Sequence, residues 1–85
     1  NNIAAILQLV LFSITSEQYS KAIERFNQIL RIDSSKIDMY VYLGDTYIAM
    51  GDKLNAINNY EKYKSQVKDT LVKKDIEEYI KKLKQ

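Results

Sequence analysis

With 85 residues, the chain is long enough for one small domain whose core is only just sufficient on its own. It contains no cysteine and no histidine, which excludes disulfides and thiolate metal sites and removes the commonest general base. The apolar fraction of 46% is enough for a core, and the absence of proline with only two glycines predicts a nearly all-helical domain. The net charge of +2 is too weak to indicate a nucleic-acid partner.

Residues 3–14 form the first predicted helix, which is the most apolar segment of the chain. Ten of its twelve residues are apolar, and only Gln8 and Ser13 interrupt the run. The segment is shorter than the roughly 20 residues that a membrane-spanning helix needs. Because a helix that is apolar on nearly every side must be covered on nearly every side, we expect it to pack against a second copy of the chain or a missing part of the parent protein. The residues expected to make this contact are Ile3, Ile6, Leu7, Val10 and Leu11.

The second predicted helix begins after Thr15 and Ser16, whose hydroxyl groups are suitable N-caps, and it continues to about Ile32. Its apolar residues recur at helical spacing on one face. These residues are Tyr19, Ala22, Ile23, Phe26, Ile29 and Leu30. A short polar turn follows, in which Ser35 and Asp38 form a weak capping-box pattern for the next helix.

Residues 40–60 contain both glycines and predict a helical hairpin. The apolar spacing of its first helix stops before Gly51, where the left-handed backbone conformation common at helix C-termini favours glycine. Asp52 follows as a suitable N-cap for the second helix. Gly44 lies in the middle of the first helix, where glycine costs about 1 kcal/mol relative to alanine, so we expect it to permit close approach of the second helix.

The segment after Tyr63 is rich in lysine, and its apolar residues follow helical spacing over about residues 70–84. Since neither glycine nor proline occurs after Asp52, residues 53–84 could also form one continuous helix. We favour a break near Asp69 and Thr70, because both are good helix caps. The basic face of this segment is interpreted as a solvated capping face. A patch for nucleic acid or anionic lipid is the alternative, which the interspersed acidic residues disfavour.

A shift of 34 residues along the sequence superposes the two predicted hairpins. It places Ala22 on Ala56, Ile23 on Ile57, Phe26 on Tyr60, Ile29 on Tyr63, Ile6 on Tyr40 and Leu9 on Leu43. A helix–turn–helix unit with a period of about 34 residues resembles the tetratricopeptide repeat. The second unit carries the family's pattern at Tyr40, Leu43, Gly44, Tyr47, Gly51, Asp52, Ala56 and Tyr60.

This resemblance implies an all-α fold of antiparallel hairpins, stacked as a short right-handed superhelix of about five helices. It places repeat 1 at about residues 3–36, repeat 2 at about 37–70 and a capping helix at about 71–84 of a single domain, 1–85. Because the chain begins at Asn1 rather than at methionine, we expect it to be a fragment of a longer protein.

The first unit departs from the family's pattern. Glu17 occupies the position of the turn glycine, where a left-handed residue with a Cβ costs roughly 1–2 kcal/mol, and this favours a different turn in the first unit. Val10 and Ser13 replace the glycine and the aromatic residue of the first helix.

The family's usual task is to hold a partner in the concave groove lined by the first helix of each hairpin. The positions that the resemblance assigns to this groove are Ala4, Leu7, Leu11, Ile14 and Thr15 in the first unit and Asp38, Val41, Asp45, Ile48 and Ala49 in the second. This lining is apolar with two carboxylates, which suits a basic or apolar helix or an extended segment. The alternative is that Leu7, Leu11 and Ile14 are core or dimer contacts.

We therefore expect a protein–protein interaction scaffold without a catalytic, metal or cofactor site. Its partner-binding residues are predicted to be Leu7, Leu11, Asp38, Val41, Asp45 and Ile48. A self-association module built on the apolar first helix, or the soluble part of a membrane-anchored protein, are the alternatives. No nucleic-acid partner is expected, and the compartment is not identified by the sequence, with the cytoplasm slightly favoured.

Overall fold

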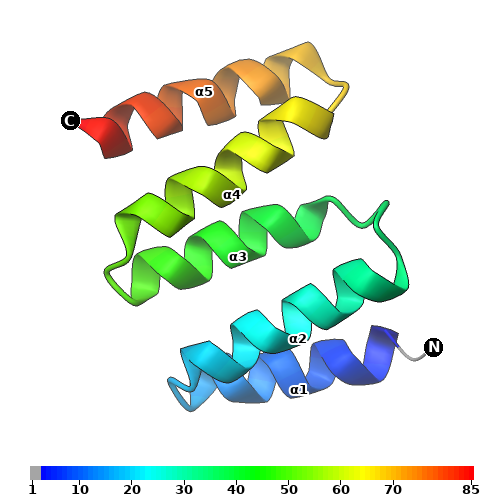
Figure 1. The fold of residues 1–85 in the computed structure, drawn as a ribbon. Coiled ribbons are helices and arrows are strands. Elements are labelled where there is room, and N and C mark those ends of the chain that lie inside the picture. Colours follow the sequence, from blue (N-terminus) through cyan, green and yellow to red (C-terminus); the bar gives the residue numbers. More distant parts are fainter. Residues whose placement is uncertain (1–2) are drawn as a thin grey trace.

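The computed structural model describes residues 3–85 and contains five α-helices in this range (Figure 1). They are α1 (Ile3–Thr15), α2 (Tyr19–Ile32), α3 (Asp38–Ala49), α4 (Lys53–Gln66) and α5 (Thr70–Lys84). No strand occurs within the described range, so the predicted all-α class is confirmed. The first two residues of the expected domain lie outside the described range.

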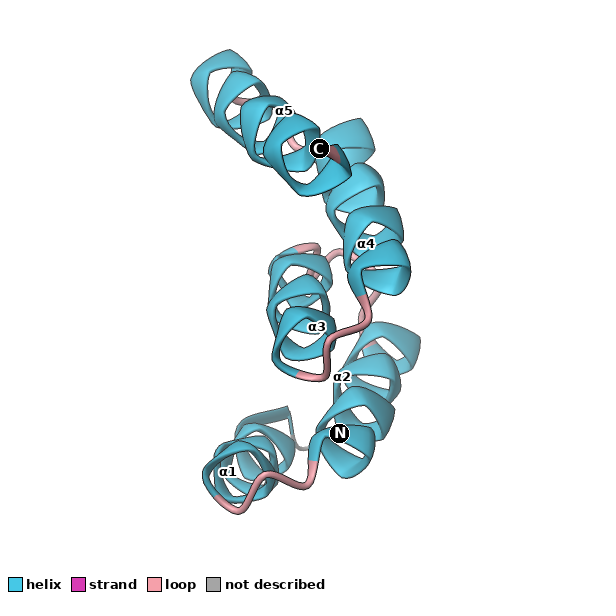
Figure 2. Cartoon of the chain, turned by 90° about the vertical axis from the view of Figure 1, so that its left-hand side faces the viewer, coloured by secondary structure: helices cyan, strands magenta, loops and turns pink. Residues whose placement is uncertain are grey.

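Successive helices form antiparallel hairpins that stack in chain order from α1 to α5 (Figure 1). The main contacts join α1 to α2, α2 to α3, α3 to α4 and α4 to α5. Figure 2 shows that α1, α3 and α5 lie on one side of the stack, where they form its concave face, and that α2 and α4 lie on the other side. The predicted arrangement of stacked helical hairpins is therefore confirmed.

The turn between α3 and α4 is closed by two backbone hydrogen bonds. The N–H of Gly51 donates to the carbonyl of Ile48 at 2.9 Å, and the N–H of Asp52 donates to the carbonyl of Tyr47 at 2.9 Å. Gly51 has a φ of 79°, in the left-handed region. This pattern is a Schellman motif, and the predicted role of Gly51 at the end of α3 is confirmed.

The turn between α1 and α2 has the same hydrogen bonds at the corresponding positions of the first hairpin. The N–H of Glu17 donates to the carbonyl of Ile14 at 3.0 Å, and the N–H of Gln18 donates to the carbonyl of Ser13 at 2.7 Å. Glu17 has a φ of 59°, so it adopts the left-handed conformation despite its Cβ. The expectation of a different turn is wrong, because the packing of the two helices requires this geometry even where glycine is absent.

Two aspartates act as helix N-caps as predicted. A carboxylate oxygen of Asp52 accepts from the N–H of Asn55 at 3.2 Å at the start of α4. A carboxylate oxygen of Asp69 accepts from the N–H groups of Leu71 and Val72 at 2.9 and 3.3 Å at the start of α5. The break between α4 and α5 is therefore where the sequence predicted it, and residues 53–84 form two helices.

Two other predicted caps are wrong. The hydroxyl of Thr15 donates to the carbonyl of Phe12 at 3.0 Å, and α2 begins after Gln18, which makes no side-chain cap. The left-handed turn requires three residues between α1 and α2, and this moves the start of α2 beyond the hydroxyl residues. Ser35 bonds instead to the carboxylate of Asp33 through its N–H and its hydroxyl, at 3.0 and 2.6 Å, so it forms a local Asx-turn rather than a capping box.

The core consists of two clusters that share α3. The first contains Ile6, Val10, Ala22, Phe26, Ile29, Met39 and Leu43, from α1, α2 and α3. The second contains Ala56, Tyr60 and Ile80, with partly buried residues of α3, α4 and α5 packed against them. Ala22 and Ala56 are both fully buried, in agreement with their superposition by the repeat offset.

The helices α3 and α4 approach each other closely at Gly44. A Cβ added to Gly44 would lie 2.6 Å from Cζ of Tyr60, which is too short for any real contact. The predicted role of this glycine is confirmed, since the tyrosine ring occupies the space of its missing side chain. The Tyr60 hydroxyl then donates to the carboxylate of Asp45 at 2.5 Å and joins α4 to α3 a second time.

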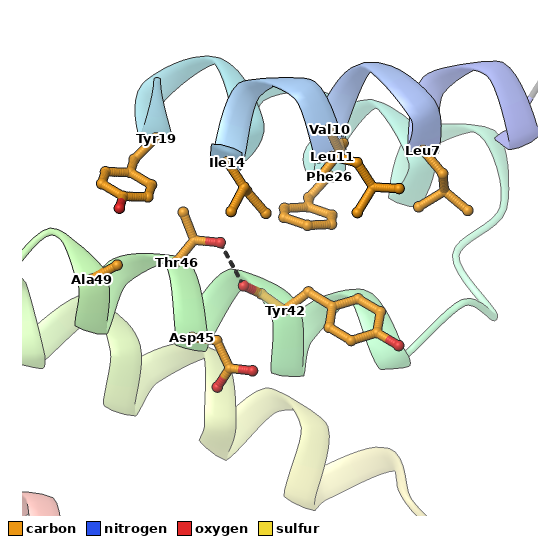
Figure 3. Close-up of a pocket in the computed structure, with 10 residues that line it drawn as sticks. All are labelled: Leu7, Val10, Leu11, Ile14, Tyr19, Phe26, Tyr42, Asp45, Thr46 and Ala49. Atoms are coloured by element: carbon orange, nitrogen blue, oxygen red, sulfur yellow. Dashed lines mark hydrogen bonds between the residues drawn. The ribbon is translucent and has the colours of Figure 1, made fainter. Parts of the chain in front are cut away.

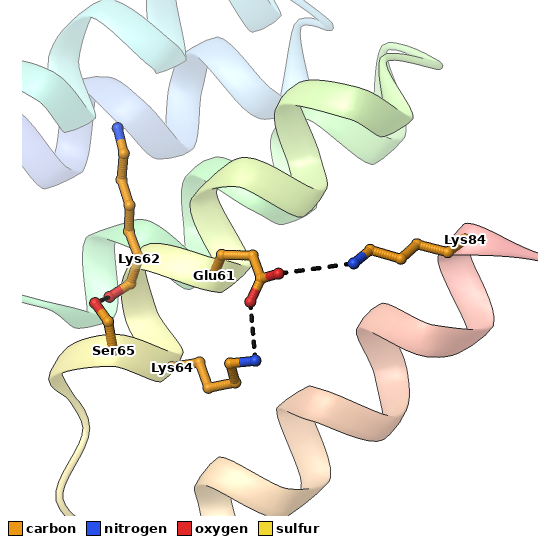
Figure 4. Close-up of polar contacts among 5 residues, drawn as sticks. All are labelled: Glu61, Lys62, Lys64, Ser65 and Lys84. Carbon is orange, nitrogen blue, oxygen red and sulfur yellow. Dashed lines mark hydrogen bonds and ion pairs between the residues drawn. The ribbon is translucent and has the colours of Figure 1, made fainter.

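The contact between α4 and α5 includes a small charged group on the surface (Figure 4). Glu61 accepts from Lys64 of its own helix at 3.0 Å and lies 3.8 Å from the Nζ of Lys84 in α5. Exposed pairs of this kind contribute about 0–1 kcal/mol. The buried side chain of Ile80 therefore contributes more to the attachment of α5 than these ion pairs do.

Candidate partner-binding site

An apolar pocket with a cavity volume of about 560 Å³ lies between α1 and α3 (Figure 3). α1 contributes Leu7, Val10, Leu11 and Ile14; α2 contributes Tyr19 and Phe26; and α3 contributes Tyr42, Asp45, Thr46 and Ala49. This volume is within the range of about 300–1,000 Å³ that is typical of ligand sites in proteins. Residues far apart in the sequence thus enclose a space large enough for several side chains of a partner.

The α1 wall follows from the second apolar stripe of that helix. Its first stripe is buried against α2, while Leu7, Leu11 and Ile14 recur at steps of four and three on a neighbouring face. Leu11 is 59% exposed even though it lines the pocket. A large apolar side chain is therefore presented to solvent at the edge of the cavity, where a partner can cover it.

The base of the pocket is aromatic and buried. Phe26 and Val10 are 3% and 2% exposed, so both belong to the first core cluster as well as to the pocket. The Phe26 ring lies 5.9 Å from the ring of Tyr42, centroid to centroid, with the planes tilted by 31°. This aromatic pair links α2 to α3, and both rings line the cavity.

Two polar side chains of the α3 wall, Thr46 and Asp45, are bonded within the chain. The Thr46 hydroxyl donates to the carbonyl of Tyr42 at 2.7 Å, and Figure 3 shows the Asp45 side chain pointing away from α1. The Asp45 carboxylate accepts the hydrogen bond from Tyr60. Burial, together with this carboxylate, raises the pKa of Tyr60 well above its ordinary value, so the hydroxyl remains a donor. The interior of the pocket is therefore apolar, with one negative charge at its edge.

Of the three helices that line the pocket, α2 contributes only Tyr19 and Phe26, and the other two, α1 and α3, carry charges of one sign. α1 and α3 contain Asp38 and Asp45 but no lysine or arginine, although the chain has thirteen basic residues. All thirteen lie in the other segments. The concave surface between α1 and α3 is therefore apolar and weakly acidic in a chain that is basic as a whole.

The structure brings together three of the six predicted partner-binding residues. Leu7, Leu11 and Asp45 line the pocket, together with two further predicted groove positions, Ile14 and Ala49. The other three lie elsewhere, because α3 is rotated so that a neighbouring face points toward α1.

Val41 and Ile48 are partly buried against the second core cluster. Asp38, in the first turn of α3, is exposed and does not line the cavity. Val41 and Ile48 are consequently occupied by contacts within the chain, whereas Asp38 remains exposed outside the pocket.

Five residues that line the pocket were not among the predicted groove or partner-binding residues, although Val10 was predicted for self-association: Val10, Tyr19, Phe26, Tyr42 and Thr46. Tyr42 and Thr46 are four residues apart and occur with Asp45 and Ala49 on one helical face, which is a detectable spacing. Phe26 and Val10 gave no signal of their own, because core residues that also border a cavity have the same pattern as other core residues.

The residues predicted for self-association differ in burial, and two of them, Ile3 and Leu7, are partly buried against the first core cluster. Ile6 and Val10 are 9% and 2% exposed and pack in the core of their own chain. Leu11 remains exposed, and so do Leu9 and Phe12, at 47% and 65%. A second copy could therefore contact only the outer side of α1, rather than the whole predicted set.

Two further findings concern the described residues 3–85. No helix in this range is long and apolar enough to cross a membrane. No group of three or more acidic side chains in this range is arranged to hold a metal ion.

No protein-family model and no curated protein matches the sequence. The tetratricopeptide resemblance is therefore still a prediction that rests on the residues of this chain.

Proposed function

We propose that this chain is a protein–protein interaction module, which holds a segment of a partner in the pocket between α1 and α3. The observation that carries the proposal is the pocket itself, an apolar cavity on the concave face with exposed Leu11 at its edge. Monomeric proteins rarely leave a large apolar hollow uncovered unless it binds something. The absence of histidine and cysteine makes catalysis at this site a poor alternative.

The proposal includes a tetratricopeptide-like architecture. One constant offset relates the two turns, the two buried alanines and the two aromatic residues Phe26 and Tyr60, and these correspondences support it. In such an architecture the first helices of successive hairpins form the concave surface, as α1, α3 and α5 do in Figure 2. A partner segment would then lie across these helices.

The size of the pocket suggests the strength of binding. A leucine or isoleucine side chain that becomes fully buried contributes about 1.5–3 kcal/mol. Two or three such side chains, reduced by the entropy lost on association, give affinities in about the micromolar range. We therefore expect a reversible contact rather than a permanent one.

The proposed function can be tested with a variant whose own side chains occupy the pocket, called the filled variant below. Thr46→Ile combined with Ala49→Leu places larger apolar side chains in the cavity, and Asn58→Leu on the exposed side of α4 is the matched control. A displayed peptide library selected on the wild-type protein should yield sequences that bind the control variant equally but lose about tenfold or more in affinity for the filled variant.

Sequences that bind the filled variant as well as the wild type would place recognition elsewhere. A selection that enriches no sequence would contradict the proposed function. In both cases, retained helical signal and an unchanged or raised unfolding midpoint would show that the filled variant is folded.

Self-association is a second candidate, which is favoured by the exposure of Leu9 and Phe12 on the outer side of α1. Sedimentation of the wild type and of Leu9→Ser with Phe12→Ser would test it. A wild-type dimer that the double variant converts to a monomer supports this candidate, and a wild-type monomer at about 100 μM, a concentration well above a micromolar dissociation constant, contradicts it.

A further inference from the structure

The pocket exists because α3 has smaller side chains than α5 at three of four corresponding positions, the exception being Tyr42. The α5 residues that pack toward α3 and α4 are Ile76, Tyr79, Ile80 and Leu83, and the repeat offset superposes them on Tyr42, Asp45, Thr46 and Ala49. The two helices thus occupy corresponding places, each packed on the hairpin before it. Only one of the two junctions is filled by the chain itself.

The junction beside α5 shows what fills such a space. Ile80 is 3% exposed and packs with Ala56 and Tyr60, while Ile76 and Leu83 pack at the edges of the same cluster. The ring of Tyr79 meets the ring of Tyr60 edge to face, with 5.3 Å between centroids.

At the α1–α3 junction, the corresponding Thr46 turns its hydroxyl to its own backbone, and Ala49 ends at its Cβ. What is missing between α1 and α3 is therefore the volume of large apolar side chains at helical spacing.

The dimensions of the pocket indicate the conformation of the segment that supplies this volume. Leu7 and Ile14 are seven residues apart on α1, and Tyr42 and Ala49 are seven apart on α3, so each wall is about 10 Å long, or two helical turns. A helix places side chains at i, i+3, i+4 and i+7 along this length. The junction beside α5 is filled with this same spacing.

The charges around the pocket indicate the composition of the segment. Asp45 is the one charged side chain among the residues that line the pocket, and one of its oxygens accepts a hydrogen bond from Tyr60. An anionic partner would find no basic side chain among these residues, whereas a cationic one would find Asp45 at the edge of the pocket. We infer that the partner of this pocket is a cationic amphipathic helix with isoleucine, leucine or tyrosine at i, i+3, i+4 and i+7.

This inference rests on the proposed function and goes further by naming the class of partner. The probes are two synthetic peptides with identical apolar residues at that spacing, one with lysine and one with glutamate at the flanking positions. Each is about 15 residues long, near the length at which an isolated helix becomes stable in water. Their affinities are measured by fluorescence anisotropy for the wild type, for Thr46→Ile with Ala49→Leu, and for Asp45→Asn. Asp75→Asn on the exposed side of α5 is the charge control.

We expect the lysine peptide to bind the wild type about tenfold more tightly than the glutamate peptide does. Its affinity for the filled variant, Thr46→Ile with Ala49→Leu, should be about tenfold or more lower than for the wild type. Asp45→Asn keeps an acceptor for the Tyr60 hydroxyl while it removes the negative charge. It should lower the affinity for the lysine peptide by about two- to fivefold. Asp75→Asn should leave binding unchanged.

If the two peptides bind the wild type equally and neither binds the filled variant, the inference of a cationic partner is overturned, while the proposed function remains supported. Tighter binding of the glutamate peptide, or binding of neither peptide, would also overturn this inference. The library selection described above would then decide separately whether the pocket binds any peptide at all.

Discussion

The two hairpins share a turn and a buried alanine but differ in how their helices meet. In the α3–α4 hairpin, Gly44 lets the ring of Tyr60 lie against the backbone, and the hydroxyl reaches Asp45. In the α1–α2 hairpin, the corresponding residues are Val10 and Phe26, which together form part of the base of the pocket. At these two positions the α3–α4 hairpin makes contacts within itself, whereas the α1–α2 hairpin lines the pocket that it shares with α3.

The difference shows that equivalent positions in a repeat can serve different ends. A hydroxyl on Tyr60 finds an acceptor one helix away, so α3 and α4 form a tightly joined unit. Phe26 has no hydroxyl, and its ring contacts Tyr42 of the next hairpin instead. The first hairpin therefore contributes its aromatic residue to the binding surface, and the second uses its own for stability.

The largest effect is expected when the second hairpin is given the residue of the first. In Gly44→Val, the new side chain meets the Tyr60 ring and forces two helices apart, so we expect a loss of about 3 kcal/mol in the free energy of unfolding, measured with urea. Ala49→Val, at an exposed position of the same helix, is the control and should lose less than about 1 kcal/mol. Similar losses in the two variants would contradict the close approach of α4 at Gly44.

An intermediate effect is expected from exchanging the residues of the two turns. Glu17→Gly should raise the free energy of unfolding by about 1 kcal/mol, because glycine adopts the left-handed conformation without a Cβ penalty. Gly51→Glu should lower it by about 1–2 kcal/mol for the same reason. Urea midpoints measure both, and a Glu17→Gly variant no more stable than the wild type would show that the Glu17 side chain offsets its own strain.

The smallest effect concerns the start of the second helix in each hairpin. Gln18 makes no side-chain cap, whereas Asp52 at the corresponding place does. Gln18→Asp should therefore stabilise the protein by about 0.5–1 kcal/mol near pH 7, and Gln18→Glu, with the same charge but poor capping geometry, should not.

The stabilisation expected from Gln18→Asp should depend on pH and should be lost in acid. Hydrogen bonds from Asn55 lower the pKa of Asp52, so the stabilisation by this carboxylate is present above the ordinary pKa of aspartate and is lost as the pH falls through the lowered value. For an aspartate at position 18 we expect the backbone bond, since the N–H of Lys21 corresponds to that of Asn55, while Lys21 has no amide side chain to add the second one. Thermal melts between pH 7 and about pH 2 should show the advantage of Gln18→Asp disappearing below about pH 4, and an advantage that persists in acid would exclude capping as its cause.

Much of the fold could be predicted because its determinants are local. Gly51 ends α3 through its own backbone conformation, and Asp52 and Asp69 begin helices through bonds to residues two or three positions away. The periodicity of apolar residues then fixed five helices, and the repeat offset related the hairpins. Prediction from local residues was wrong at the turn around Glu17. There the chain adopts a left-handed conformation that a residue with a Cβ disfavours.

The site was predicted only in part, because it depends on how α3 is rotated about its axis. Adjacent residues on a helix point about 100° apart, so Val41 and Tyr42 face different neighbours. The sequence by itself determined that both belong to one amphipathic helix. Only the packing of α3 between two hairpins decided that Val41 faces the second core and that Tyr42 faces the pocket, since that rotation depends on the side chains of helices distant in the chain.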